Sequence, residues 1–182
     1  MAETASAKTL TPDDLDRIAA ELDEDPAAFF AKPVQMRWWL HGGEPGSGSD
    51  TVTIAVAEPG AKVTATCVRA RPNNNYRPPM LVERVEGEIE PEQAAVVARA
   101  MLRSPLFREA APGAAGPKLA DGLKETWDFQ RGGASLSKTV MEPFPDELEH
   151  VRAAFHGVRD FVVLNAERTV KSEKATGKDG TP

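Results

Sequence analysis

Cysteine is almost absent from this chain, because Cys67 is the only one among 182 residues. A single thiol excludes an intrachain disulfide and a cysteine-rich zinc site, and it is typical of a protein from a reducing compartment. Cys67 lies in the β-rich stretch VTATCVRAR. There we expect a packed, unreactive thiol rather than a nucleophile.

Long apolar runs are also missing. No stretch approaches the roughly 18 consecutive apolar residues that a membrane span requires. The first residues, MAETASAKTLTPDDLD, lack the basic start and apolar run of a secretory signal. We therefore expect a soluble, cytoplasmic protein that does not associate with a membrane.

Basic residues are fewer than acidic residues in this chain. The formal net charge is −6, and residues 1–25 alone hold eight acids against two bases, so the rest of the chain is neutral. A nucleic-acid-binding protein normally carries a basic patch or stripe. The composition therefore disfavours nucleic acid as a partner, although residues 62–84 hold five bases against one acid.

No motif typical of a catalytic or metal site is present. The three histidines are His41, His150 and His156, and the last two lie six residues apart, which would place their rings about 120° apart around a helix. There is no HExxH, HxxxH or GxSxG motif and no calcium-loop spacing. We expect no catalytic residue, no cofactor and no metal; an active site built from carboxylates alone would leave no such motif.

Apolar spacing and helix-start signals predict three helices. Thr11 and Pro12 are typical of a helix start in TPDDLDRIAAELDED, and Pro91 opens EPEQAAVVARAMLRS. The longest helix is predicted in PDELEHVRAAFHGVRDFVVLNAER. The expected core-facing residues are spaced by three and four: Leu15, Ile18, Ala19, Leu22, Ala94, Val97, Ala98, Met101, Leu102, Leu148, Val151, Ala154, Phe155, Val158, Phe161 and Val162.

Six stretches have β character. QMRWWLH, TVTIAVA, KVTATCVRAR and PMLVERVEG predict an antiparallel meander, and KETWDFQR and ASLSKTVME predict a hairpin that turns at Gly132 and Gly133. The predicted fold class is α+β, with a mostly antiparallel sheet of five or six strands and helices packed on it. The expected organisation is a disordered N-terminus at 1–9, a single domain at 10–168 and a disordered tail at 169–182.

The order helix, strand meander, helix, hairpin, helix resembles the α-βββ-α-ββ-α arrangement of type III secretion chaperones and related acidic bacterial α+β proteins. Its second half is similar to small emfourin-type protease inhibitors. The resemblance lies in element order, from which the extra strand after residue 79 departs. Element order by itself does not establish function.

Trp38 and Trp39 are adjacent, so on a strand they point to opposite faces. We expect Trp38 in the core. Trp39 is either covered by the N-terminal helix and its phenylalanines, or exposed beside Arg37 and His41. In the second case it would be an amphipathic anchor for a partner.

The segment RPNNNYRPP, residues 71–79, is predicted to form a projecting loop, since its prolines cannot donate to a sheet ladder. It either serves as scaffold near the acidic N-terminal helix or presents arginine, tyrosine and asparagine groups to a ligand. The preferred function is a non-catalytic, cytoplasmic, chaperone- or adaptor-like protein-binding module, as a monomer or a homodimer. The alternatives are an anion or nucleic-acid binder through loop 69–84 and a protease-inhibitor-like protein. The expected partner-binding residues are Arg69, Arg71, Asn74, Tyr76, Arg77 and Trp39.

Overall fold

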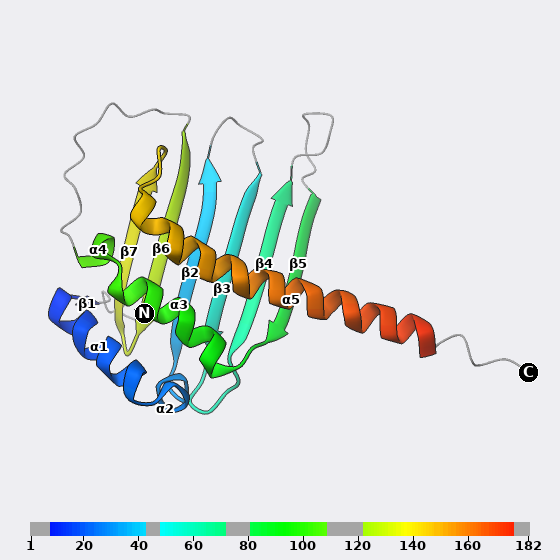
Figure 1. Ribbon diagram of the computed structural model, residues 1–182, viewed down its shortest axis with the longest axis horizontal. Coiled ribbons are helices and arrows are strands. Elements are labelled where there is room, and N and C mark those ends of the chain that lie inside the picture. Colours follow the sequence, from blue (N-terminus) through cyan, green and yellow to red (C-terminus); the bar gives the residue numbers. More distant parts are fainter. Residues whose placement is uncertain (1–7, 43–47, 72–80, 109–121, 177–182) are drawn as a thin grey trace, which may run out of the picture.

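A seven-stranded sheet with helices on one of its faces makes up the fold (Figure 1). The computed structural model describes residues 8–42, 48–71, 81–108 and 122–176. The strands lie in the order β1-β7-β6-β2-β3-β4-β5. Their bounds are β1 Lys8–Thr9, β2 Val34–Gly42, β3 Ser49–Val56, β4 Thr64–Arg71, β5 Leu81–Glu88, β6 Leu123–Arg131 and β7 Ala134–Met141.

The helices lie together on one side of this sheet, and α5 crosses the strands and runs on past β5 (Figure 1). The start of α1 is fixed by a reciprocal cap: the Asp14 N–H donates to Thr11 Oγ1 at 3.2 Å, and the Thr11 N–H donates to Asp14 Oδ2 at 3.1 Å. The helices are α1 Pro12–Glu24, α2 Pro26–Phe30, α3 Pro91–Arg103, α4 Pro105–Arg108 and α5 Glu149–Thr176, the last preceded by a 3-10 turn at Asp146–Leu148.

The hydrophobic core lies between the helices and one face of the sheet. Along β2, Val34, Met36 and Trp38 are buried, and the residues between them point to the opposite face. The rings of Trp38 and Trp127 are 6.2 Å apart, and Phe155 of α5 lies 5.8 Å from Trp127. These large side chains therefore join α5 to the two central strands.

The α+β class is confirmed, but the predicted sheet of five or six mostly antiparallel strands is corrected to a mixed sheet of seven. The additional strand, β1, pairs in parallel with β7, and the other five strand pairs are antiparallel. Its backbone bonds are Lys8 N–H to the Gly133 carbonyl at 3.3 Å and Leu10 N–H to the Ser135 carbonyl at 3.1 Å. A two-residue strand is too short to show a period of two, so the sequence gives no sign of it.

The element boundaries also differ from prediction at both ends. β1 lies within the segment 1–9 that was expected to be disordered, and α5 continues to Thr176, inside the expected tail 169–182. The predicted connection at 110–122 lies almost wholly outside the described residues. The hairpin turn is confirmed, with φ of 58° at Gly132 and 77° at Gly133.

The predicted core stripes of the three long helices are confirmed with one exception. Phe161 is 38% exposed and so does not widen the stripe of α5. The contact with the sheet passes instead through Val162, which is 2% exposed and packs over Gly87. Within the part of the chain that the structure describes, no helix is both long and apolar enough to cross a membrane.

Candidate functional site

The sheet face opposite the helices, here called the open face, is built from alternate residues of the six longer strands. Among the described residues no helix covers it (Figure 1). The strand register aligns these residues in rows that run from β7 to β5. Three of the rows are Ser135-Gln130-Gln35-Ala55-Thr64-Glu88, Ser137-Asp128-Arg37-Thr53-Thr66-Glu86 and Thr139-Thr126-Trp39-Thr51-Val68-Arg84.

Trp39 lies near the middle of the open face, between the side chains of two residues on its own strand, Arg37 and His41. Its ring stacks on the ring of His41 with centroids 3.7 Å apart and an angle of 20° between the planes. The guanidinium carbon of Arg37 lies 5.9 Å from the Trp39 ring centre, within cation–π range. The structure therefore places Trp39 beside Arg37 and His41, and the alternative in which the N-terminal helix covers it is wrong.

The polar neighbours of Trp39 form two short hydrogen-bond chains. Arg37 donates through Nε to Asp128 Oδ2 at 2.7 Å, and Ser137 Oγ donates to the other carboxylate oxygen at 2.6 Å. On the other side His41 Nε2 lies 3.2 Å from Thr126 Oγ1. Burial, and secondarily the nearby charge of Lys124, lowers the pKa of His41. A neutral His41 ring is therefore favoured against Trp39 at pH 7.

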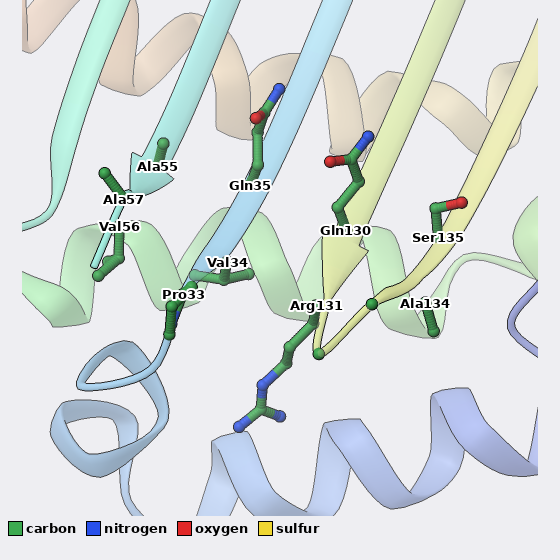
Figure 2. A pocket seen from close by; sticks show the side chains of 12 residues that line it. Pro33, Val34, Gln35, Ala55, Val56, Ala57, Gln130, Arg131, Ala134 and Ser135 are labelled. Atoms are coloured by element: carbon green, nitrogen blue, oxygen red, sulfur yellow. The ribbon is translucent and has the colours of Figure 1, made fainter. Parts of the chain in front are cut away.

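A shallow hollow of about 390 Å³ lies at the lower end of the open face (Figure 2). Gln35, Gln130 and Ser135 project into this region from three neighbouring strands, whereas Arg131 points toward α1. The small side chain of Ala55 leaves the hollow open on the β3 side. Neither glutamine amide has a hydrogen-bond partner among the described residues, so the donors and acceptors of both can bond to a ligand.

The six predicted partner-binding residues do not form one surface in the part of the chain that is described. Arg69 lies on the helix side of β4, where its Nε donates to Asp50 Oδ1 at 2.8 Å, and this bond raises the pKa of Arg69. Arg71 is exposed at the end of β4. Trp39 is on the opposite face from Arg69. The remaining three, Asn74, Tyr76 and Arg77, lie outside the described residues.

Cys67 faces the helices, with 7% of its surface exposed. Burial raises the pKa of its thiol, as expected for a packed cysteine. It is one of the residues that line a hollow of about 280 Å³ between α5 and strands β3 to β5. No group of three histidine, cysteine or acidic side chains that could hold a metal occurs within the described ranges.

A buried charged group under α5 was not found from the sequence. Glu125 is 1% exposed and accepts hydrogen bonds from Arg152 Nε at 2.7 Å, from the second guanidinium nitrogen at 2.8 Å and from the Trp38 indole N–H at 3.3 Å. His156 lies edge-on to Trp38 with centroids 4.9 Å apart. The carboxylate is fully bonded within the core, so the group holds α5 against the sheet.

The open face itself could have been found from the sequence by extending the two-residue period. Gln35, Arg37, Trp39 and His41 alternate with core residues along β2, and Thr51 and Thr53 do so along β3. What the sequence does not show is that all the long helices pack on the same side. In comparisons with known proteins, no protein-family model and no curated protein matches this chain.

Proposed function

We propose that this protein is a non-catalytic, chaperone- or adaptor-like protein-binding module whose contact surface is the open face, with Trp39 as the anchor. The observation that carries the proposal is the position of Trp39 between His41 and Arg37, on the face that the helices leave uncovered. Tryptophan and arginine contribute disproportionately to protein–protein contacts. Trp39 is half-buried, and its neighbours hold the ring in place.

The stacked arrangement lowers the entropic cost of binding. A side chain that is already fixed loses little rotamer freedom when a partner covers it. Trp39 is packed against His41 at 3.7 Å, and Arg37 is fixed by Asp128 at 2.7 Å. The anchor and its neighbour are therefore ordered before the partner arrives.

The shape of the open face fits an extended segment of a partner chain. Gln35 and Trp39 lie on the same strand, four residues apart, which corresponds to about 13 Å. An extended segment of four or five residues spans that length. Its backbone can bond to the amides of Gln35 and Gln130 in the hollow (Figure 2). One of its side chains can then pack on Trp39.

The charge of this surface disfavours a nucleic-acid partner. Arg37 is neutralised by Asp128, and Arg84, at the far end of the row that contains Trp39, pairs with Glu86 at 3.0 Å. Phosphate binding needs cations that are free to replace counterions. Threonine, serine and glutamine side chains instead offer uncharged donors and acceptors, which suit a polypeptide. A cytoplasmic location belongs to the same proposal, and the single buried thiol fits it.

The proposal is tested by purifying the tagged chain from the cells that express it and identifying bound proteins by native mass spectrometry. Trp39→Ala should weaken the complex by at least about 30-fold, which corresponds to about 2 kcal/mol. Val96→Ala is the control, because Val96 is an exposed hydrophobic residue on α3, on the helix side of the sheet. An equal loss with both variants, or a complex that survives Trp39→Ala, would contradict the proposal.

A further inference from the structure

Strand β5 forms one edge of the sheet and is not paired on its outer side by any described residue. The Ile89 N–H donates to the Val63 carbonyl at 3.0 Å, so the odd-numbered residues of this strand direct their backbone groups toward β4. Because the direction alternates along a strand, the N–H and C=O groups of Val82, Arg84 and Glu86 point to the free edge. Such an edge is a template for another strand.

The side chains of β5 carry a charge pattern that is complementary to itself. Arg84 and Glu86 share the open face, and their side chains are 3.0 Å apart. When a second β5 pairs antiparallel about a two-fold axis at Val85, Arg84 of each copy lies opposite Glu86 of the other. A shift of the register by two residues in either direction places Arg84 opposite Arg84, or Glu86 opposite Glu86, and directly opposed like charges are unfavourable.

Exposed apolar side chains gather near the same edge. Four large hydrophobic residues are exposed among the described residues, and three of them are Val82, Phe161 and Leu164. Val82 lies on the open face of β5, whereas Phe161 and Leu164 lie on α5 on the other side of the sheet and flank Val162, whose side chain lies 3.3 Å from the position that a Cβ on Gly87 would take. α5 then runs past β5 (Figure 1). A neighbouring copy at this edge would cover apolar surface that the monomer leaves in water.

We propose that this protein forms a homodimer in which β5 pairs antiparallel with β5 of a second copy, in the register centred on Val85. The two sheets then form one continuous sheet, and α5 of each copy extends toward the other subunit. The two open faces lie on the same side, so the dimer presents two Trp39 anchors to one partner or to two. This pairing does not depend on the protein-binding function, since it uses the edge of the sheet and not its open face.

Charge exchange at the edge tests the pairing. The wild-type chain should sediment at twice the 19.6 kDa of one chain in analytical ultracentrifugation across a concentration series. Arg84→Glu places like charges opposite each other twice and should raise the dimer dissociation constant by at least tenfold. The double variant Arg84→Glu with Glu86→Arg restores the opposite charges and should restore the dimer.

A cysteine cross-link tests the register. In the Cys67→Ser background, Val85→Cys brings two thiols opposite each other in a non-hydrogen-bonded pair, where Cα atoms are about 4.5 Å apart and a disulfide can form. Oxidised glutathione should then give a covalent dimer on a non-reducing gel. Val82→Cys is the control, because position 82 lies opposite Glu88 of the second copy and should give none. A monomeric wild-type chain, failure of the double charge exchange to restore a dimer, or equal cross-linking at both positions would overturn the proposal.

Discussion

Trp39 stacks on His41, two residues along the same strand, with ring centroids 3.7 Å apart on the sheet face that the helices leave open. Side chains two apart on a strand share a face, so β2 itself sets this contact. The same strand buries Trp38 on the other face at 1% exposure. One strand thus supplies both the centre of the core and the centre of the proposed contact surface.

Removing one partner of the buried Glu125–Arg152 pair should be strongly destabilising. Arg152→Met leaves the Glu125 carboxylate in the core without its cation, and we expect the free energy of unfolding to fall by about 3 kcal/mol. Arg17→Met is the control, since Arg17 belongs to exposed ion pairs and should change stability by less than about 1 kcal/mol. Urea denaturation of both variants measures the difference, and equal small losses would contradict the proposed role of the buried pair.

Acid should destabilise the fold through His156. Burial first, and the charge of Arg159 second, lower the pKa of His156 below its usual value of 6.5, and Nε2 is buried without a hydrogen-bond partner among the described residues. The other charged groups that act on the ring are Arg152, Asp160 and Glu125, the last from β6. The unfolded chain therefore takes up a proton near pH 6.5 while the folded chain does not, so stability is lost as pH falls from 6.5 toward the folded pKa.

His156→Gln removes this proton uptake. The free energy of unfolding of the variant should fall less between pH 7.5 and pH 5 than that of the wild type, as measured by urea denaturation at each pH. His41, whose pKa is also lowered, still titrates in the variant and supplies the remaining slope. A variant that loses as much stability as the wild type over this range would show that His156 does not titrate differently on folding.

Alanine at Gly157 and alanine at Gly132 should change the free energy of unfolding in opposite directions, although both positions have room for a Cβ. A Cβ added at Gly157 or at Gly132 meets no atom within 4 Å. Gly157 is inside α5, so Gly157→Ala should raise the free energy of unfolding by about 0.5–1 kcal/mol. Gly132 has φ of 58°, and alanine there should cost about 1 kcal/mol because L-residues resist the left-handed conformation. Thermal denaturation of the two variants checks the sign, and a loss of stability at Gly157 would contradict the assignment.

The α1 cap gives a further acid-dependent contribution. Hydrogen bonds from the backbone and side chain of Thr11 lower the pKa of Asp14 to about 2. Stability from this carboxylate is therefore present above its ordinary pKa of 3.8 and is lost as pH falls toward 2. Thr11→Ala removes only the side-chain bonds of the cap and should cost about 1 kcal/mol at pH 7. Asp14→Asn removes the titrating carboxylate and should flatten the pH dependence between 4 and 2, and retention of the full slope in Asp14→Asn would contradict Asp14 as its cause.

Local patterns predicted most of the fold, and tertiary placement accounts for what they missed. The cap at Thr11, the stripes of the long helices and the Gly132–Gly133 turn each depend on a few neighbouring residues, and the sequence displays them directly. The strand β1 depends on a partner more than 120 residues away, so two residues carry no local signal for it.

At the candidate site, too, some features follow from local sequence and others depend on tertiary packing. The opposite orientation of Trp38 and Trp39 follows from the strand period alone. Which of the two side chains faces solvent depends on the face of the sheet on which α1, α3 and α5 pack. The packing of the whole chain determines that face. The Glu125–Arg152 bond joins residues 27 positions apart in sequence, and it could not be inferred from spacing within a single element.

The most direct measurement for the open face as the contact surface is site-specific photocross-linking in the cells that express the protein. A benzophenone amino acid at Thr53 or Thr139 lies on the open face, and one at Val96 lies on the exposed side of α3. We expect protein adducts at positions 53 and 139 that decrease when Trp39→Ala is added, with little adduct at 96. Adducts concentrated at 96, or adducts at 53 and 139 that do not respond to Trp39→Ala, would contradict the open face as the contact surface.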